Sequence, residues 1–520
     1  MTQTITTPFI DVRLSLAELV GDAYLDAVCE SRAWLSGEDP ARLRAEAQEE
    51  VDCFPAELQA RLAALLPHVG EAVCTGLAQS AGGATSQGFA QATHTAMSPL
   101  SGLGYYRVGE DGRLYLITKS EHYHAPLGHA FPGYQLIERA RRLGIANATH
   151  NNTRGHITRL LEEALVCAAH GLAPDDHAGL AAVRAADDLF CVNRVLNLET
   201  GSLATEAALK MMLARFYPPQ PGASAPYAGR TPVVLVMGND DGGTPGNYHG
   251  TTVLTQALRG MWPDFTAALE AHGLLHVCPI RPNSLDDLEA AFAKYEQPPY
   301  KIAGFFHEII MMNYGARELT RDFLTRAYAL CHAHDVPAAV DEIQSCMWAP
   351  GFFLFREYGL QPSFVIIGKG FPNGEYPASR VLFSAAMDNL PQFGALVTNG
   401  QEELASLAYL ITMRWAAANT ERTRRIGDRY AARLRDLAAR HPRHIASTDG
   451  SRHLTALVFH TLPSAKQFVA RLTAQGLDIS AQTYKADCPP VVLTKLPLIA
   501  GEEVVELVVT RMEAALDGLA

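Results

Sequence analysis

The chain has 520 residues, which is more than one compact core usually holds, so we expect two or three domains. It carries 43 Lys and Arg against 55 Asp and Glu, a formal charge of -12, without a block of like charges. This balance argues against a nucleic-acid partner, because such binding needs a basic surface. The nine cysteines are scattered without a CxxC pair. Because we find neither a signal-peptide pattern nor an apolar stretch of about 18 residues, we expect a cytoplasmic protein with reduced thiols and no membrane partner.

The first hundred residues read as a helical N-terminal extension. Apolar residues recur at three-and-four spacing from residue 14 to about residue 74, which is typical of amphipathic helices. A Gly- and Ser-rich segment, 81–104, then interrupts the pattern. We therefore place a boundary near residue 98 and predict an extension over 1–98.

Between about residues 185 and 385, short apolar runs alternate with helical stretches. This alternation predicts an α/β domain with a mostly parallel, seven-stranded sheet covered on both faces. The seven runs are 189–192, 233–237, 275–279, 302–306, 337–340, 364–367 and 380–383.

A different pattern follows residue 400. A long helical stretch, 402–440, leads into short strands and a closing helix over 502–516, which predicts a smaller α+β domain. We expect 151–400 to form the large domain, 401–520 the C-terminal small domain, and 99–150 the N-terminal part of that small domain.

The most informative constellation follows two of the predicted strands. Asp341 opens the motif Asp341-Glu342-Ile343-Gln344 at the end of one strand, and Lys369 lies just beyond another. Ligands of open α/β sheets bind outside the carboxyl ends of the strands, so these two side chains are expected to converge. A carboxylate that keeps a pyridine nitrogen protonated and a lysine that forms a Schiff base are what pyridoxal 5'-phosphate needs. Taken singly, the aspartate also suits a helix cap and the lysine a solvated turn.

From near Tyr105 onward the sequence resembles the class III aminotransferases, a pyridoxal-phosphate-dependent family of fold type I. The order Asp341 to Gln344, Gly368-Lys369-Gly370 and Pro377 is similar to the family's Asp-Glu-Val-Gln to Lys to Pro segment. The resemblance implies that Asp341 binds the pyridine nitrogen and that Gln344 lies near the phenolic oxygen. It also implies that Lys369 carries the cofactor as a Schiff base and shuttles protons.

Three further segments match family motifs. Gly201 and Ser202 open a segment that resembles the family's phosphate-binding helix N-terminus, where backbone N–H groups and a hydroxyl suit a phosphate dianion. Tyr248, before His249-Gly250, resembles the aromatic residue that stacks on the cofactor ring. Thr398 matches the threonine that reaches the phosphate of the neighbouring subunit's cofactor, which implies a homodimer. Without the resemblance, these residues suit a capped helix, a loop and a turn.

Several positions depart from the family pattern. Glu308 stands where a glutamate gates substrate recognition, but Ile309 replaces the proline that follows it. Ala349 replaces an expected arginine, and Lys495 stands where many members place an arginine that clamps a substrate carboxylate. A lysine supplies charge without the bidentate fork. We take Glu308 and Lys495 as candidate substrate residues, and the amino donor and acceptor stay open.

The segment Glu121-His122-Tyr123-His124 has the look of a metal-binding His-x-His pair. A zinc site needs further ligands at metal spacing, and the sequence offers no third one nearby. We therefore interpret these as ordinary polar side chains and expect no metal.

The predicted function is that of an aminotransferase, which moves an amino group between an amino acid or amine and a keto acid or aldehyde through a Lys369 Schiff base. An aminomutase, a racemase or an epimerase is an alternative that uses the same site without net exchange. A cofactor-binding scaffold whose N-terminal helices hold a partner is a third. Fold-level analogy does not separate them.

Overall fold

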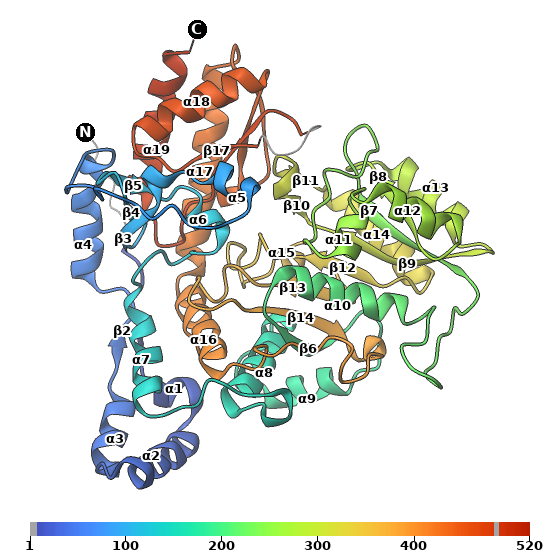
Figure 1. Ribbon diagram of the computed structural model, residues 1–520, viewed down its shortest axis with the longest axis horizontal. Coiled ribbons are helices and arrows are strands. Elements are labelled where there is room, and N and C mark those ends of the chain that lie inside the picture. Colours follow the sequence, from blue (N-terminus) through green and yellow to red (C-terminus); the bar gives the residue numbers. More distant parts are fainter. Residues whose placement is uncertain (1–7, 483–487, 520) are drawn as a thin grey trace.

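A computed structural model describes residues 8–482 and 488–519. Its largest element is a seven-stranded sheet with the order β6-β14-β13-β12-β9-β7-β8 (Figure 1). The strands are β6 (Val192–Leu198), β7 (Thr231–Met237), β8 (His276–Ile280), β9 (Tyr300–His307), β12 (Ala338–Asp341), β13 (Phe364–Ile367) and β14 (Ser379–Ser384). The predicted seven-stranded α/β sheet is therefore confirmed.

The sheet is parallel from β13 through β12, β9 and β7 to β8, whereas β14 runs antiparallel to both of its neighbours. One predicted strand was misplaced: the run 189–192 meets the strand only at its last residue, because β6 begins at Val192. Asn193, Arg194 and Asn197 interrupt the apolar pattern of β6, so this strand does not form a continuous apolar run. Asn193 and Asn197 are buried, but their amide groups are hydrogen-bonded: Asn193 donates to the carbonyls of Val183 and Ala186, and Asn197 donates to Glu162.

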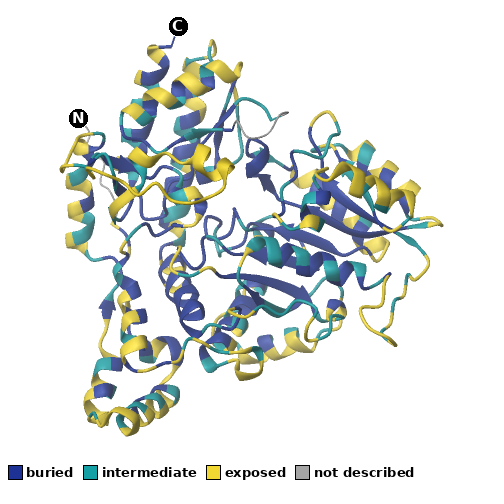
Figure 2. Ribbon diagram, viewed as in Figure 1, coloured by how far each residue is buried: buried dark blue, intermediate teal, exposed yellow. Residues whose placement is uncertain are grey.

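Both faces of the sheet are buried, as Figure 2 shows. Val233 and Leu235 belong to one apolar cluster, and Val234 and Val236 to the other, because successive side chains on a strand point to opposite faces. The helices of this region are α8 (His156–His170), α9 (His177–Ala185), α10 (Gly201–Leu213), α11 (Val253–Ala257), α12 (Pro263–Ala271), α13 (Leu285–Tyr295), α14 (Arg321–Ala333) and α15 (Leu354–Glu357). Two short strands, β10 (Ile310–Met311) and β11 (Arg317–Glu318), pair separately.

The N-terminal region is mainly helical and is tied to the body by aromatic rings. Its elements are β1 (Arg13–Leu14), α1 (Leu16–Val20), α2 (Asp22–Ser36), α3 (Pro40–Gln48), β2 (Val51–Asp52), α4 (Ala56–Leu65) and α5 (Gln87–Ala92). Phe9, Phe54 and Phe131 surround the fully buried Trp415, with ring centroids 5.5, 6.0 and 5.9 Å from the Trp415 ring. The extension therefore packs against α16 (Glu403–Ala418).

Two smaller sheets complete the fold. The first contains β3 (Pro99–Leu103), β4 (Tyr106–Gly109) and β5 (Leu114–Leu116), and the second contains β15 (Ile445–Asp449), β16 (Ala456–Phe459), β17 (Ser480–Ala481) and β18 (Val491–Leu493). A parallel bridge between Leu116 and Leu477 joins segments far apart in sequence. The accompanying helices are α6 (Ser120–Tyr123), α7 (Gln135–Arg142), α17 (Thr420–Arg440), α18 (Leu462–Ala474) and α19 (Glu502–Asp517).

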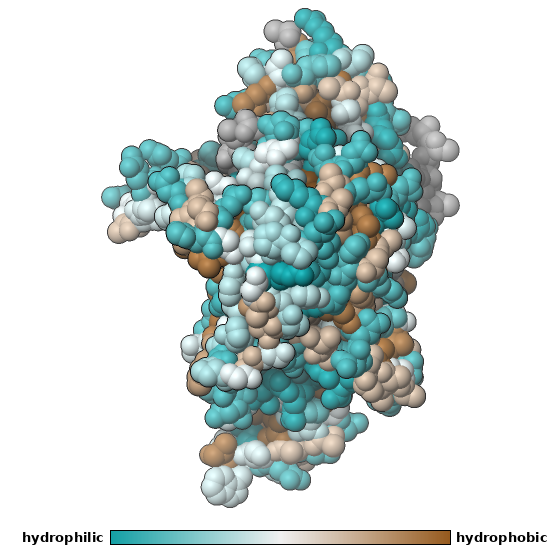
Figure 3. Space-filling model, turned by 90° about the vertical axis from the view of Figure 1, so that its right-hand side faces the viewer, coloured by the Kyte–Doolittle hydropathy of each residue, from teal (hydrophilic) through white to brown (hydrophobic). Residues whose placement is uncertain are grey.

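The surface is mostly polar. The face in Figure 3 is largely hydrophilic, with small hydrophobic areas between. Within residues 8–482 and 488–519, no helix is both long and apolar enough to cross a membrane.

Candidate active site

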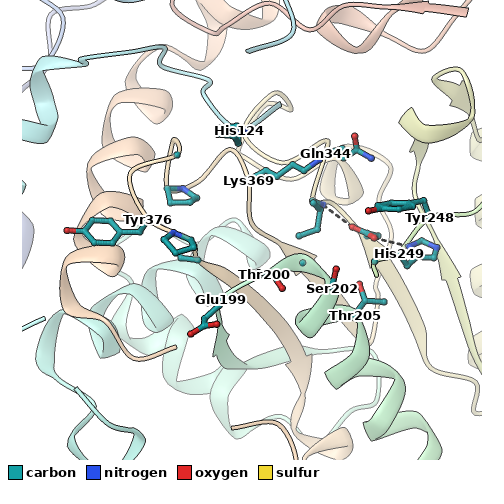
Figure 4. A pocket seen from close by; sticks show the side chains of 18 residues that line it. His124, Glu199, Thr200, Ser202, Thr205, Tyr248, His249, Gln344, Lys369 and Tyr376 are labelled. Atoms are coloured by element: carbon teal, nitrogen blue, oxygen red, sulfur yellow. Dashed lines mark hydrogen bonds and ion pairs between the residues drawn. The ribbon is translucent and has the colours of Figure 1, made fainter. Parts of the chain in front are cut away.

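A cavity of about 520 Å³ opens at the carboxyl ends of β12 and β13 and at the N-terminus of α10. Figure 4 shows the side chains that line it. Of the predicted residues, the structure brings six together in its wall: Gly201, Ser202, Tyr248, Asp341, Gln344 and Lys369. Three others, Glu308, Thr398 and Lys495, do not line it.

Asp341 ends β12 and is almost fully buried, with 6% of its surface exposed. Its Oδ2 lies 2.8 Å from Nδ1 of His249, and its Oδ1 accepts a hydrogen bond from the backbone N–H of Ile343, as the dashed lines in Figure 4 mark. These two contacts fix the orientation of the carboxylate. An aspartate so held offers a stationary negative charge to a ligand in the cavity.

Lys369 lies two residues beyond the end of β13, with a backbone φ of 31° in the left-handed region. Burial lowers the pKa of its amine below the ordinary lysine value, although the carboxylates of Glu308 and Asp341 act in the opposite direction. A lowered pKa increases the fraction of neutral amine. A neutral, positioned amine is the form that acts as a nucleophile or a base.

The N-terminus of α10 forms the floor of the cavity near Ser202 (Figure 4). Thr200 caps the helix by accepting a hydrogen bond from the N–H of Leu203, and Ser202 Oγ accepts one from the N–H of Thr251 at 3.0 Å. Gly201 permits close packing, since a Cβ there would lie 2.8 Å from Ile343 Cδ1. The first N–H groups of a helix have no intrahelical acceptor, so they suit an anion.

Gln344 and Glu308 lie next to each other beside the cavity. Gln344 Nε2 donates to Glu308 Oε1 at 3.3 Å, and Glu308 is buried, with 5% of its surface exposed. Glu308 therefore stands behind Gln344 and acts on Lys369 through its charge. Whether it contacts a substrate stays a prediction.

Lys495 is fully buried behind the cavity wall. Its Nζ donates to the backbone carbonyl of Gln344 and lies 3.6 Å from the ring centroid of Trp348 and 4.9 Å from that of Tyr123. Burial drives the pKa of this amine well below its ordinary value, and the charge of Lys369 lowers it further. These contacts give Lys495 a structural task, and its predicted contact with a substrate carboxylate stays a prediction.

The segment that carried the His-x-His pattern forms a left-handed turn. Ser120, Glu121, His122 and Tyr123 have φ values of 47°, 50°, 59° and 76°. Left-handed backbone costs an L-residue about 1–2 kcal/mol, and strained residues concentrate at functional sites. The turn places the ring centroid of Tyr123 5.4 Å from Lys369 Nζ. Among the described residues, no cluster of His, Cys, Asp and Glu is arranged to hold a metal.

Thr398 lies at the surface, in a turn, and the cavity wall of its own chain does not include it. Its predicted reach into a neighbouring subunit stays a prediction.

The fold and the geometry of the cavity define an α/β protein of fold type I. The family model for class III aminotransferases matches residues 91–516, so the chain belongs to this family, whose enzymes depend on pyridoxal 5'-phosphate.

Similar proteins include the 5-aminovalerate aminotransferase of Pseudomonas aeruginosa, which is 26% identical over 260 residues, covering 48% of this chain and 56% of that protein. The ornithine aminotransferase of Schizosaccharomyces pombe is 27% identical over 288 residues, covering 53% of this chain and 56% of that protein. The match thus spans just over half the length of these relatives. The crystal structure of ornithine aminotransferase from Toxoplasma gondii shares the fold, with a TM-score of 0.61 and 20% identity over 80% of this chain and 89% of that chain.

The residues present fit this cofactor. Asp341 suits its pyridine nitrogen and the start of α10 its phosphate. Thr205, also in the cavity wall, has a buried Oγ1 without a hydrogen-bond partner among the described residues. A buried polar atom left in this state points to a ligand or a water that satisfies it.

Sequence reasoning assigned no role to several residues of the site, among them His249 and Thr205 in the cavity wall and Tyr123 beside Lys369. His249 was within reach, because it directly follows Tyr248 in the motif already singled out. Thr205 lies one helical turn beyond Gly201, on the same helix face, which was the available signal. No sequence signal was available for Tyr123, since none of the residues around it indicates left-handed backbone.

Proposed function

We propose that this protein is a pyridoxal-phosphate-dependent aminotransferase that moves an amino group between an amino acid or amine and a keto acid or aldehyde. The observation that carries the proposal is the convergence of Lys369 and Asp341 on one cavity from the ends of two adjacent parallel strands. The N-terminus of α10 opens into the same cavity. Membership of the class III aminotransferase family supports this assignment.

When bound, the cofactor supplies a ring that accepts the electrons released as a substrate C–H bond breaks. Asp341 holds a proton on the ring nitrogen, and His249 keeps the Asp341 carboxylate oriented through their 2.8 Å contact. Lys369 anchors the cofactor through its amine. The same amine would move the proton of the substrate carbon, and its lowered pKa favours the neutral form that acts as a base.

The remaining residues orient the reactants. Gly201 and Ser202 hold the phosphate with the N–H groups of the first helical turn. Tyr248 would pack its ring against the cofactor, and Gln344 would bond the phenolic oxygen, since both residues line the cavity. Glu308, bonded to Gln344, and Lys495, bonded to the Gln344 carbonyl, stay our candidates for contact with the substrate.

The proposal extends to assembly and location. We infer a homodimer in which Thr398 reaches the phosphate of the partner's cofactor, since Thr398 is exposed and outside its own cavity. The nine cysteines are scattered without a CxxC pair, which supports a reducing, cytoplasmic location. We also propose the division into an extension (1–98), a large domain (151–400) and a small domain made from 99–150 and 401–520. The bridge between Leu116 and Leu477 supports the two-part small domain.

The test is the substitution Lys369→Ala, with the exposed Lys466→Ala as a matched control. Loss of both the anchor and the base is expected to reduce kcat at least about a thousandfold. After reconstitution of the native protein, borohydride should attach the bound cofactor irreversibly to Lys369, and peptide mass spectrometry would locate the adduct. This experiment would identify the anchor independently of any substrate.

Three outcomes would contradict parts of the proposal. Normal transamination by Lys369→Ala without an added amine would remove Lys369 from the chemistry. Isomerised substrate in a closed mixture, without amino-group exchange, would favour an aminomutase or racemase. Sedimentation of the protein as a monomer at working concentration would contradict the role of Thr398.

A further inference from the structure

The left-handed turn at residues 120–123 is held by a set of ion pairs. Glu121 Oε2 accepts a hydrogen bond from Nη1 of Arg107 at 2.5 Å, and Glu121 Oε1 lies 2.9 Å from Nε2 of His129. The other arm of the Arg107 guanidinium bonds Asp478 at 3.2 Å, and Lys119 approaches the same carboxylate at 3.3 Å. The cluster therefore joins the turn to β4 and to the segment before β17.

This cluster is well shielded from water. The side chains of Arg107, Asp478 and Glu121 are 8%, 13% and 18% exposed. Burial acts to raise the pKa of Glu121, but the hydrogen bond from His129 and the charge of Arg107 outweigh it, so the pKa lies below the ordinary glutamate value. A charged carboxylate that is bonded to two other side chains is held strongly in one orientation.

The turn has few backbone bonds of its own to hold it. The N–H of Tyr123 donates to Lys119 O at 2.8 Å, and the N–H groups of His124 and Ala125 both donate to Ser120 O. Four consecutive non-glycine residues in left-handed backbone persist only where surrounding contacts fix them. From the centre of the turn, the charged side chain of Glu121 reaches outside it to Arg107 and His129.

We propose that Glu121 is a positioning residue, which holds segment 120–123 in its left-handed form and thereby fixes the ring of Tyr123 against the amine of Lys369. Tyr123 is 4% exposed and contacts both Lys369 and Lys495 through its ring face. Its ring limits the positions of the Lys369 amine and covers one side of it, while Lys369 also lines the cavity. The expected effect of Glu121 on turnover rests on the proposed aminotransferase function, whereas its effect on the position of the Tyr123 ring does not.

The test uses the cofactor-free protein and needs no substrate. Lys369 is acetylated at alkaline pH, where access rather than protonation limits the rate, and the exposed Lys466 serves as the internal standard. Glu121→Gln is expected to raise the relative rate at Lys369 about tenfold, because loss of the cluster opens the local structure. Amide hydrogen exchange over residues 118–126 should accelerate in parallel.

Glu502→Gln is the matched control. Glu502 pairs with Arg422 at 2.8 Å in the C-terminal region, and the side chains of Arg422 and Glu502 are 7% and 21% exposed, close to the values for Arg107 and Glu121. This substitution removes a similar pair without touching the turn, so the labelling of Lys369 should not change. If Glu121→Gln does not fold, His129→Ala removes one of the two supports and should give a smaller increase in the same assay.

A double-variant cycle shows whether Glu121 acts through Tyr123. Tyr123→Leu alone should expose Lys369 as Glu121→Gln does, and the combined variant should add nothing further, because residues in one chain of contacts do not act additively. Unchanged labelling in Glu121→Gln, or full additivity in the double variant, would overturn the proposal. In the holoenzyme, Glu121→Gln is expected to lower kcat about tenfold with unchanged cofactor affinity. An inactive native protein that still gives the labelling result would refute the aminotransferase activity alone.

Discussion

The two sides of the cavity are built by different means. On the sheet side, Asp341 and Lys369 follow buried strands, and Ser202 lies in the first turn of α10. Backbone hydrogen bonds repeated along many residues fix these positions. On the small-domain side, Tyr123 depends on a strained turn that a few ion pairs hold. Single substitutions should therefore alter chemistry on the first side and geometry on the second.

Asp341→Asn tests the sheet side and should have the largest effect. The amide oxygen can still accept from the N–H of Ile343, and the amide nitrogen can donate to Nδ1 of His249 when that ring carries its proton on Nε2. The fold should therefore persist while the negative charge is lost. We expect kcat to fall about a hundredfold to a thousandfold, the usual cost of removing one preorganised electrostatic contact. Steady-state kinetics with the exposed Asp322→Asn as the control would measure it. Unchanged kinetics would remove Asp341 from the electronic role.

Trp415→Ala tests how the small-domain side is anchored. The substitution leaves Phe9, Phe54 and Phe131 around a cavity, and comparable truncations cost about 3–5 kcal/mol. The loss should appear first in the extension and in residues near Phe131, before the large sheet opens. Native-state hydrogen exchange resolves the two regions. Equal acceleration throughout the protein would show that both sides unfold together.

Glu342, on the sheet side, makes the stability of the protein depend on pH. Its fully buried carboxyl group accepts from the N–H groups of Leu354 and Phe355 and from Ser345. Burial nevertheless raises its pKa from 4.5 to about 7. The folded state thus binds the proton more tightly than the unfolded state. This contribution to stability is complete below the unfolded pKa and is lost as the pH rises through about 7.

Comparison of the native protein with Glu342→Gln isolates this effect. The raised pKa predicts that the free energy of unfolding of the native protein loses about 2–3 kcal/mol more than that of the variant between about pH 5 and pH 8. His307 and His453, whose pKa values burial lowers to about 3, act in the opposite direction in both proteins and cancel in the difference. Denaturant unfolding at each pH would measure it, and parallel stability curves would contradict the assignment.

The sheet side could largely be predicted from the sequence. Continuous apolar runs located six of the seven strands, and the polar residues after two of them marked the site. The first strand was misplaced because β6 carries Asn193, Arg194 and Asn197. Asp341 and Lys369 could be identified because the carboxyl ends of neighbouring parallel strands lie at the same edge of the sheet.

The small-domain side could not be predicted in the same way. Ser120, Glu121, His122 and Tyr123 include no glycine, so no local preference indicates left-handed backbone. The contacts that hold it come from Arg107 in β4 and from His129, and Arg107 is itself held by Asp478, which is distant in sequence. Lys495 illustrates the same limit: its type suggested a charge offered to a substrate, but its environment is set by Trp348, Tyr123 and the Gln344 carbonyl.

The segment around Lys495 also sets the order in which the site is completed during synthesis. Ser120 Oγ donates to Lys495 O, although 375 positions separate the two residues, and the N–H of Leu498 donates to Pro126 O. Translation at about 5–20 residues per second needs about 6–25 seconds to pass from Lys369 to Lys495. During that interval the growing chain contains Lys369 and Asp341, but the turn at 120–123 still lacks its contacts with the C-terminal segment. The small-domain side of the cavity is completed only after that segment has been synthesised.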